Sequence, residues 1–329
     1  MNDSRTRRPR PAAPDLPLRV GVSACLLGHN VRYDGGHKRD AFLLDGFGRH
    51  VEWVPVCPEV EMGMGTPREP IRLETRGDVV HLVAPKSGTD HTAAMRRFAD
   101  TRVRALAAES LSGYIFKKDS PSCGVFRVRV HNENGLVTRT GRGAFADVLI
   151  EHFPGLPVEE EGRLGDPILR ESFVERVFAY ARLRALFTGR WTVGGLVAFH
   201  TAQKLLLMAH SPSAYASIGR LVARAKDVAR ADLRERYSKD VMEALAVPAT
   251  RGRHVNVLQH AYGYFSERLT ADEREEMATL IDDYRRGLLP LVVPITLLRH
   301  YVRRFDVGYL NGQVYLEPHP KELMLRNHV

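Results

Sequence analysis

Residues 18–28 have the sequence LRVGVSACLLG, in which a short β-branched run is followed by a cysteine and then by a glycine. The run predicts a strand, and Gly28 predicts the turn that ends it. Residues 51–56 (VEWVPV) and 113–116 (GYIF) have the same character and predict two more strands. Between these two strands, residues 89–111 place apolar side chains at steps of three and four, as a long helix requires. Strands that alternate with helices predict an α/β domain with a mainly parallel sheet.

The chain divides at an acidic stretch that contains glycine and proline. We expect the α/β domain to span residues 18–158 and a linker to occupy residues 159–166. From residue 167 to 329 apolar side chains recur at helical spacing, which predicts an all-α helical C-terminal domain. The expected helices lie at 167–187, 192–209, 213–225, 231–245, 251–269, 272–287 and 291–304. An Asn-Gly pair within residues 309–316 (YLNGQVYL) predicts a small hairpin or a wrapping strand.

The composition is that of a globular protein with a basic surface. Its 329 residues are 44% hydrophobic, which excludes global disorder. The 48 Lys and Arg residues exceed the 39 Asp and Glu residues and give a net charge of +9, which favours polyanionic partners such as nucleic acid. No segment reaches the ~18 consecutive apolar residues of a membrane span. Residues 1–17 are rich in Arg and Pro without the apolar run of a signal peptide, so we expect a disordered basic arm on a cytoplasmic protein.

The three cysteines, Cys25, Cys57 and Cys123, each stand at a predicted strand end and enter a turn. The carboxyl ends of parallel strands line the ligand crevice of such sheets, so three thiols there would form a set of soft ligands. Zinc would need a fourth ligand or a water molecule, an iron–sulfur cluster is the other soft-thiolate option, and a single cysteine is often a core residue. The spacings of 32 and 66 residues match no local motif and do not decide between these options.

These cysteine motifs resemble those of the thiouracil desulfidase family, the domain of unknown function 523. The matching stretches are 23–28 (SACLLG) with 30–35 (NVRYDG), 56–59 (VCPE) with 66–68 (TPR), and 117–124 (KKDSPSCG). The C-terminal half is similar to the domain of unknown function 1722, which is YbgA-like. That similarity lies in 199–210 (FHTAQKLLLMAH), 254–260 (HVNVLQH), 263–265 (GYF) and 313–325.

The family resemblance implies a [4Fe–4S] cluster held by Cys25, Cys57 and Cys123, with the fourth iron open. It implies removal of sulfur from a thiolated pyrimidine, which gives the oxo base and hydrosulfide. The fusion of the two domains resembles the desulfidases that act on 4-thiouridine in tRNA. Our hypothesis is a non-redox hydrolysis in which the open iron acts as a Lewis acid on the C=S bond and water adds to the ring carbon.

Water attack needs a base and a proton donor. Glu59, two residues after Cys57, is the candidate base, and Ser120 is the candidate that orients the base or the proton transfer. The alternative is that Glu59 is an ordinary turn glutamate and Ser120 a former of the Ser-Pro turn. Arg32 and Asp34 are candidate substrate contacts that could equally build the turn, and Tyr33 is a candidate for stacking on a base or for packing. Lys117 and Lys118, beside the third cysteine, are candidate contacts to phosphate.

The helical half carries most of the basic excess and several histidines. Each histidine alone is more often a hydrogen-bonded packing residue, whereas together with arginines the histidines would suit RNA phosphates. We expect this domain to position tRNA. The candidate backbone contacts are Lys204, Arg220, Arg224, Arg251 and Arg253.

Two other functions remain open at this point. One keeps the cluster and takes free thiouracil or thiouridine as the substrate. The other is a non-enzymatic RNA-binding protein whose thiols hold a structural metal or sense the redox state.

Overall fold

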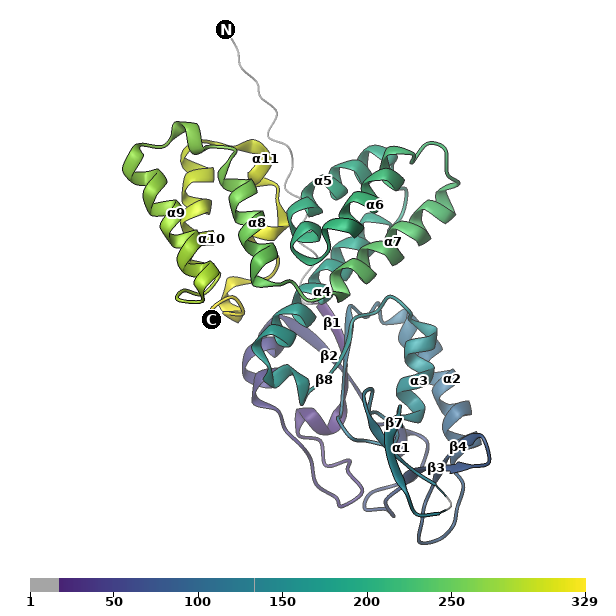
Figure 1. Ribbon diagram of the computed structural model, residues 1–329. Coiled ribbons are helices and arrows are strands. Elements are labelled where there is room, and N and C mark those ends of the chain that lie inside the picture. Colours follow the sequence, from purple (N-terminus) through teal and green to yellow (C-terminus); the bar gives the residue numbers. More distant parts are fainter. Residues whose placement is uncertain (1–17, 133) are drawn as a thin grey trace. The chain divides into compact units, whose positions relative to one another are not determined.

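A parallel sheet of four strands forms the centre of the first unit, and β1 (Leu18–Ser23) lies inside it. β1 pairs in parallel with β2 (Val51–Val56) and with β5 (Gly113–Phe116), and β5 pairs in parallel with β8 (Val158–Glu160). Val20 and Val22 on β1 are fully buried, as expected for a parallel strand between covered faces. The predicted α/β class with a mainly parallel sheet is confirmed (Figure 1).

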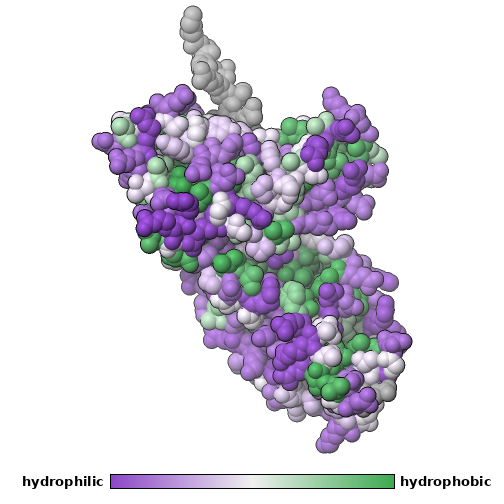
Figure 2. All heavy atoms as spheres, in the orientation of Figure 1, coloured by the Kyte–Doolittle hydropathy of each residue, from purple (hydrophilic) through white to green (hydrophobic). Residues whose placement is uncertain are grey.

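The computed structural model describes residues 18–132 and 134–329, so the predicted basic arm at 1–17 lies outside the described residues. The chain forms two units, which meet in sequence between Asp166 and Pro167. Among the described residues, no helix has both the length and the apolar character needed to cross a membrane. On the face drawn in Figure 2, hydrophilic side chains predominate and apolar residues lie in smaller areas.

A second sheet, also of four strands, and the helices complete the first unit. The sheet has the order β4-β3-β6-β7, with β3 (Arg72–Arg76), β4 (Val79–Val83), β6 (Val128–His131) and β7 (Val137–Gly141). The helices are α1 (Pro58–Glu61), α2 (Thr92–Ala108) and α3 (Ala144–His152), and shorter turns are η1 (Ala24–Leu27), η2 (Phe42–Gly46), η3 (Phe47–Arg49) and η4 (Arg163–Gly165). α2 and α3 pack side by side (Figure 1).

The assignment of residues 159–166 as a linker is wrong. The stretch contains the end of β8 and η4, and both Glu159 and Glu160 are buried. Glu160 Oε1 accepts hydrogen bonds from the backbone N–H groups of Val125 (2.7 Å) and Phe126 (3.0 Å). Because these donors replace water around the carboxylate, an acidic sequence that suggests an exposed linker becomes part of the sheet.

The second unit is helical, as predicted. Its elements are α4 (Pro167–Leu186), α5 (Val193–His210), α6 (Pro212–Ala223), α7 (Arg230–Ala246), α8 (Arg251–Tyr262), η5 (Ser266–Arg268), α9 (Ala271–Arg286), α10 (Val292–Arg304), α11 (Gly308–Asn311), η6 (Val314–Leu316) and η7 (Lys321–Leu323). The helix expected at 251–269 ends earlier, at Tyr262, and a short 3-10 turn follows it. Thr270 and Glu273 form a capping box that starts α9.

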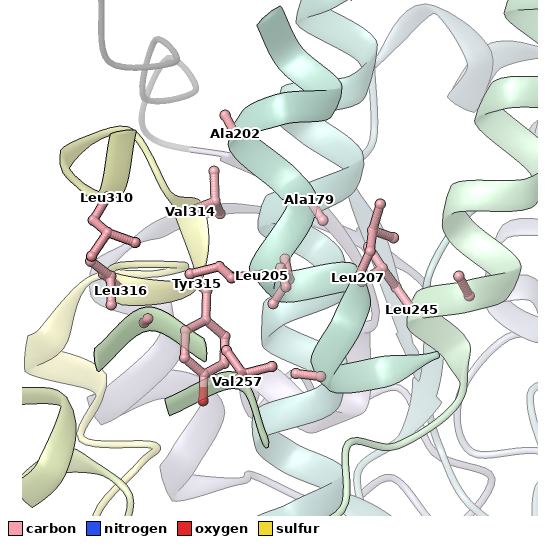
Figure 3. Close-up of a cluster of buried hydrophobic side chains, with 14 of the residues drawn as sticks. Ala179, Ala202, Leu205, Leu207, Leu245, Val257, Leu310, Val314, Tyr315 and Leu316 are labelled. Carbon is pink, nitrogen blue, oxygen red and sulfur yellow. The ribbon is translucent and has the colours of Figure 1, made fainter. Parts of the chain in front are cut away.

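The tail at 309–316 forms neither the expected hairpin nor a wrapping strand. It consists of α11 and η6 and contributes Leu310, Val314, Tyr315 and Leu316 to the buried core (Figure 3). These side chains pack in the same core as Leu205 of α5, so burial of apolar area outweighs the local turn preference of the Asn-Gly pair.

Candidate functional site

The three cysteines line one cavity of about 440 Å³ in the first unit. Cys25 lies in η1 directly after β1, Cys57 is the N-cap residue of α1 directly after β2, and Cys123 lies in the loop after β5. Since β2, β1 and β5 are neighbours in one parallel sheet, their carboxyl ends lie at one edge. The topology therefore brings together thiols that are 32 and 66 residues apart in the sequence.

Burial is the main influence on all three thiols. It raises the pKa of Cys25 to about 11, raises the pKa of Cys57, and raises the pKa of Cys123 well above its usual value. The metal-free thiols are therefore protonated at neutral pH, and a bound metal would displace those protons. The Cys57 thiol donates a hydrogen bond to the carbonyl oxygen of Val31 at 3.7 Å.

Among residues 18–132 and 134–329, no group of three His, Cys, Asp or Glu side chains has the close spacing that a single metal ion requires. An iron–sulfur cluster differs from a single ion because each thiolate binds a separate iron. The donor set here consists of three thiols and no histidine, which suits iron–sulfur chemistry better than it suits hard metal ions.

Backbone hydrogen bonds and close packing hold the Cys123 loop. The Ser120 hydroxyl oxygen accepts from the backbone N–H groups of Ser122 (3.2 Å) and Cys123 (3.1 Å). The start of α3 also packs on this loop: the N–H of Gly143 donates to the carbonyl of Gly124 at 2.7 Å, and that of Phe145 donates to the carbonyl of Ser122 at 2.9 Å. A Cβ atom at residue 143 would lie 2.5 Å from the Ser122 carbonyl carbon, so this contact requires glycine.

Glu59 lines the cavity, and both of its carboxylate oxygens have partners. The Ser122 hydroxyl donates to Oε1 at 2.9 Å, and Arg68 Nε donates to Oε2 at 2.9 Å. The Arg68 side chain is only 5% exposed, and its Nη1 also donates to the carbonyl of Gly65 at 2.9 Å. The serine that donates to Glu59 is thus Ser122 and not Ser120. Sequence reasoning missed Ser122 and Arg68, although both lie in the motifs SPSCG and TPR.

Lys117 and Lys118 both line the cavity next to the cysteines. Lys117 Nζ forms an ion pair with Glu161, and its positive charge acts on Cys25. The backbone N–H of Lys117 donates to the Ser23 hydroxyl at 2.9 Å, which ties the end of β5 to the end of β1. Lys118 is half-exposed, and its Nζ lies 4.0 Å from Asp119 Oδ2.

The RYDG motif contributes two of its three candidate residues to the cavity wall. Arg32 and Tyr33 line the cavity, and the guanidinium of Arg32 lies 5.4 Å from the centroid of the Tyr33 ring. Tyr33 is 43% exposed, so part of its side chain faces solvent. Asp34 is not part of the wall; its Oδ1 accepts from the N–H of Gly36 at 3.0 Å and stabilises the turn.

Two family models together match most of the chain. The 2-thiouracil desulfurase model matches residues 20–161, and the model of a protein family of unknown function, DUF1722, matches residues 204–320. The uncharacterised protein YbgA of Escherichia coli (strain K12) is 35% identical over 158 residues, which are 48% of this chain and 94% of YbgA. The uncharacterised protein YbbK of Bacillus subtilis (strain 168) is 33% identical over 111 residues, which are 31% of this chain and 71% of YbbK.

The chain belongs to the 2-thiouracil desulfurase family. Its helical unit carries the DUF1722 family domain, so the expected fusion of the two domains is confirmed. A solved structure of the [4Fe-4S]-dependent thiouracil desulfidase TudS is 35% identical to this chain, covers 47% of it and 98% of TudS, and has a TM-score of 0.39.

The basic residues expected to contact RNA have different surroundings in the DUF1722 domain. Arg220 and Arg224 are exposed on and just after α6. Lys204 Nζ lies 5.6 Å from the centroid of the Tyr309 ring. In contrast, Arg253 Nη1 donates to the carbonyl of His210 at 2.6 Å, and Arg251 lies over the ring of Tyr284 at 5.7 Å. Arg251 and Arg253 thus contact other residues of the helical unit.

The histidines of the DUF1722 domain are mostly hydrogen-bonded packing residues. His200 Nδ1 is 3.3 Å from the hydroxyl of Tyr237, and His254 Nδ1 is 2.9 Å from the hydroxyl of Tyr315. Burial lowers the pKa of His254 to about 3, so this ring is neutral. These contacts favour the structural interpretation of both histidines over the RNA-binding one.

A buried ionic network ties the C-terminal tail to α4. Arg326 Nε lies 3.0 Å from Glu171 Oε1, and Arg326 Nη2 lies 2.8 Å from Glu175 Oε1. Arg326 Nη1 donates to the carbonyl of Tyr315 at 2.6 Å, and His210 Nε2 lies 2.8 Å from Glu175 Oε2. Burial raises the pKa of Glu171. Burial would also raise the pKa of Glu175, but the hydrogen bond with His210 and the charge of Arg326 outweigh it and lower that pKa.

Proposed function

We propose that this chain is an iron–sulfur desulfidase that removes sulfur from 4-thiouridine in tRNA and gives uridine and hydrosulfide. The observation that carries the proposal is the meeting of three cysteines, from three strand ends, in one cavity with Glu59 and its partners. Residues 18–158 would hold the reaction site, and residues 167–329 would hold the RNA.

The cysteines fit a [4Fe–4S] cluster. Cys25, Cys57 and Cys123 would be its ligands, because the cavity offers three thiols on separate elements and no histidine. When bound through three thiolates, such a cluster supplies an iron with an open coordination position, a soft Lewis acid that suits the sulfur of a thiocarbonyl.

Glu59 would take a proton from the attacking water. Arg68 holds one carboxylate oxygen, and the Ser122 hydroxyl donates to the other, so the carboxylate has a fixed orientation in the cavity. Water then adds to the ring carbon while the C–S bond breaks, and the sulfur leaves with one proton as hydrosulfide. The overall change is C=S plus water to C=O plus hydrogen sulfide, so no electron donor is needed.

Ser120 keeps a role as a positioning residue. Its hydroxyl oxygen accepts two backbone hydrogen bonds in the Cys123 loop, and its own O–H proton remains available for the base or the substrate. Lys117 is held by Glu161, whereas Lys118 and Arg32 lie at the cavity wall, where a nucleotide phosphate would meet positive charge.

The basic surface of the chain favours RNA over a free base. A free base needs no helical domain of 163 residues, whereas a base within folded RNA must be held and exposed to the site. Of the five candidate contacts, Arg220 and Arg224 are exposed on and just after α6, and they would meet backbone phosphates. A second candidate substrate is free thiouracil, which the name of the related TudS favours.

The test begins with anaerobic purification of the full chain and measurement of iron, sulfide and zinc. We expect four irons and four sulfides per chain, and we expect tRNA with 4-thiouridine to lose that nucleoside in mass analysis faster than free 4-thiouracil is converted. Cys57→Ser should lose both iron and turnover, whereas Glu59→Gln should lose turnover and keep iron. Zinc in place of iron, or full turnover by Cys57→Ser, would refute the proposal, and faster conversion of the free base would identify it as the substrate.

A further inference from the structure

Aromatic and basic side chains gather at one place in the DUF1722 domain. Lys204 of α5, Tyr264 just after α8 and Tyr309 of α11 contribute, and these three elements are neighbours in Figure 1. The rings of Tyr264 and Tyr309 stack with their centroids 4.9 Å apart and their planes at 19°. The ring of His260 packs edge-on against Tyr264 at 5.6 Å. We call Lys204, His260, Tyr264 and Tyr309 the tyrosine cluster.

The tyrosine cluster is positively charged and rich in donors. No ion pair joins Lys204 to a carboxylate in the part of the chain that the structure describes. Burial and the charge of Lys204 lower the pKa of His260, and burial together with Tyr264 raises the pKa of Tyr309, so the phenol keeps its proton. Within the same described part, His260 Nε2 has no hydrogen-bond partner.

Part of the tyrosine cluster faces solvent. Tyr264 is 40% exposed, whereas Tyr237 and Tyr315 of the same domain are fully buried. Packing alone explains a buried tyrosine, but it does not explain an exposed ring stacked on a second ring beside an unpaired lysine. Proteins that bind single-stranded nucleic acid combine an aromatic face for a base with a nearby cation for the phosphate.

We propose that the tyrosine cluster binds one nucleotide of RNA, with its base on the exposed face of Tyr264 and its phosphate at Lys204. The inference rests on the proposed function, because it takes RNA as the partner, and it names the surface that would hold that RNA. Tyr264 and Tyr309 were not among the RNA contacts expected from the sequence; the signal was the GYF triplet at 263–265 and the tyrosine in YLNG.

The test measures binding of fluorescein-labelled tRNA to the full chain by anisotropy at several salt concentrations. Tyr264→Ala should weaken binding about 5- to 150-fold, because the base loses a stacking surface worth about 1–3 kcal/mol. Tyr264→Phe should bind as the unchanged chain does, because the ring remains. Lys204→Ala should lower the slope of log affinity against log salt by about 1, since one phosphate contact is lost.

Lys239→Ala is the matched control, because Lys239 is an exposed lysine on α7 that already pairs with Glu243. It should leave both affinity and salt slope unchanged, and thermal unfolding checks that every variant is folded. Unchanged binding by Tyr264→Ala and an unchanged slope for Lys204→Ala would overturn the inference, as would an equal loss in the control. If the cluster variants lose tRNA binding but the unchanged chain does not convert 4-thiouridine, the proposed reaction fails and the RNA site stands.

Discussion

Replacing Arg326 with alanine tests whether the buried ionic network holds the helical domain together. Arg326 is 7% exposed and lies between Glu171 and Glu175, both on α4. Its removal leaves two carboxylates within a buried region: Glu175 keeps His210 at 2.8 Å, and Glu171 keeps only the more distant His328 at 3.6 Å. The variant also releases the tail from the carbonyl of Tyr315.

The expected loss follows from this geometry. Removal of one partner of a buried ion pair costs about 3–5 kcal/mol, because the remaining charge has lost both water and its counter-ion. For a domain of 163 residues, 1 kcal/mol corresponds to a shift of about 2–4 °C in the midpoint of thermal unfolding. Arg326→Ala should therefore lower the midpoint by about 6–20 °C at neutral pH.

The assay is thermal unfolding followed by circular dichroism, with Arg299→Ala as the control. Arg299 also connects the tail region to a helix, through Glu317, but this pair is partly exposed. Exposed pairs contribute about 0–1 kcal/mol, so the control should shift the midpoint by less than about 4 °C.

The loss of stability in Arg326→Ala should depend on pH. Burial already raises the pKa of Glu171, and the loss of Arg326 removes an influence that lowers it. A carboxyl group whose pKa is higher in the folded state contributes stability at low pH and loses it as the pH rises through that pKa. The deficit of Arg326→Ala should thus be smaller at pH 5 than at pH 8. A shift below about 2 °C, or an equal deficit at both pH values, would refute the reasoning.

Three further predictions concern the first unit. Gly143→Ala should displace the loop of the third cysteine and lower the iron bound per chain. Gly165→Ala should not, because the added Cβ would meet no atom within 4 Å; equal iron in both variants would contradict this. Arg68→Ala should slow turnover roughly 10- to 150-fold and leave the visible absorbance unchanged, since Glu59 loses charged hydrogen bonds of about 1.5–3 kcal/mol. The hydroxyl and backbone N–H of Thr92 hold the pKa of Asp90 at about 2. Asp90→Ala should therefore reduce stability above about pH 4 and match the unchanged chain below about pH 2, and an equal effect at every pH would exclude this contribution of Asp90.

The strands and most helices were predictable because the apolar spacing of this chain agrees with its local structure. Residues 18–23 form β1, and six helices of the second unit begin and end within two residues of the predicted ranges. The predictions of a linker at 159–166 and of a hairpin or strand at 309–316 were wrong for one physical reason. Both depend on partners distant in sequence: Glu160 finds the backbone of Val125, and Tyr315 finds the core around α5.

The same distinction applies to the site. The three cysteines and Glu59 were found because each lies in a motif, and the structure places them in one cavity. The sequence assigned the role of orienting the base to Ser120, but only the folded loop shows that Ser122 points its hydroxyl at Glu59. Arg68 was missed because the sequence does not distinguish a buried arginine with a carboxylate partner from an arginine on the surface.

The order of the site's parts along the chain bears on its biosynthesis. All three thiols have left the ribosome once residue 123 is outside, but the glycine that seats the third thiol is residue 143, and the carboxylate that fixes the next turn is residue 160. An iron donor therefore meets a complete set of ligands only after about 40 more residues have been translated, at about 5–20 residues per second. Insertion of the proposed cluster would therefore follow the translation of β8, which would make metal delivery a late step in the maturation of this protein.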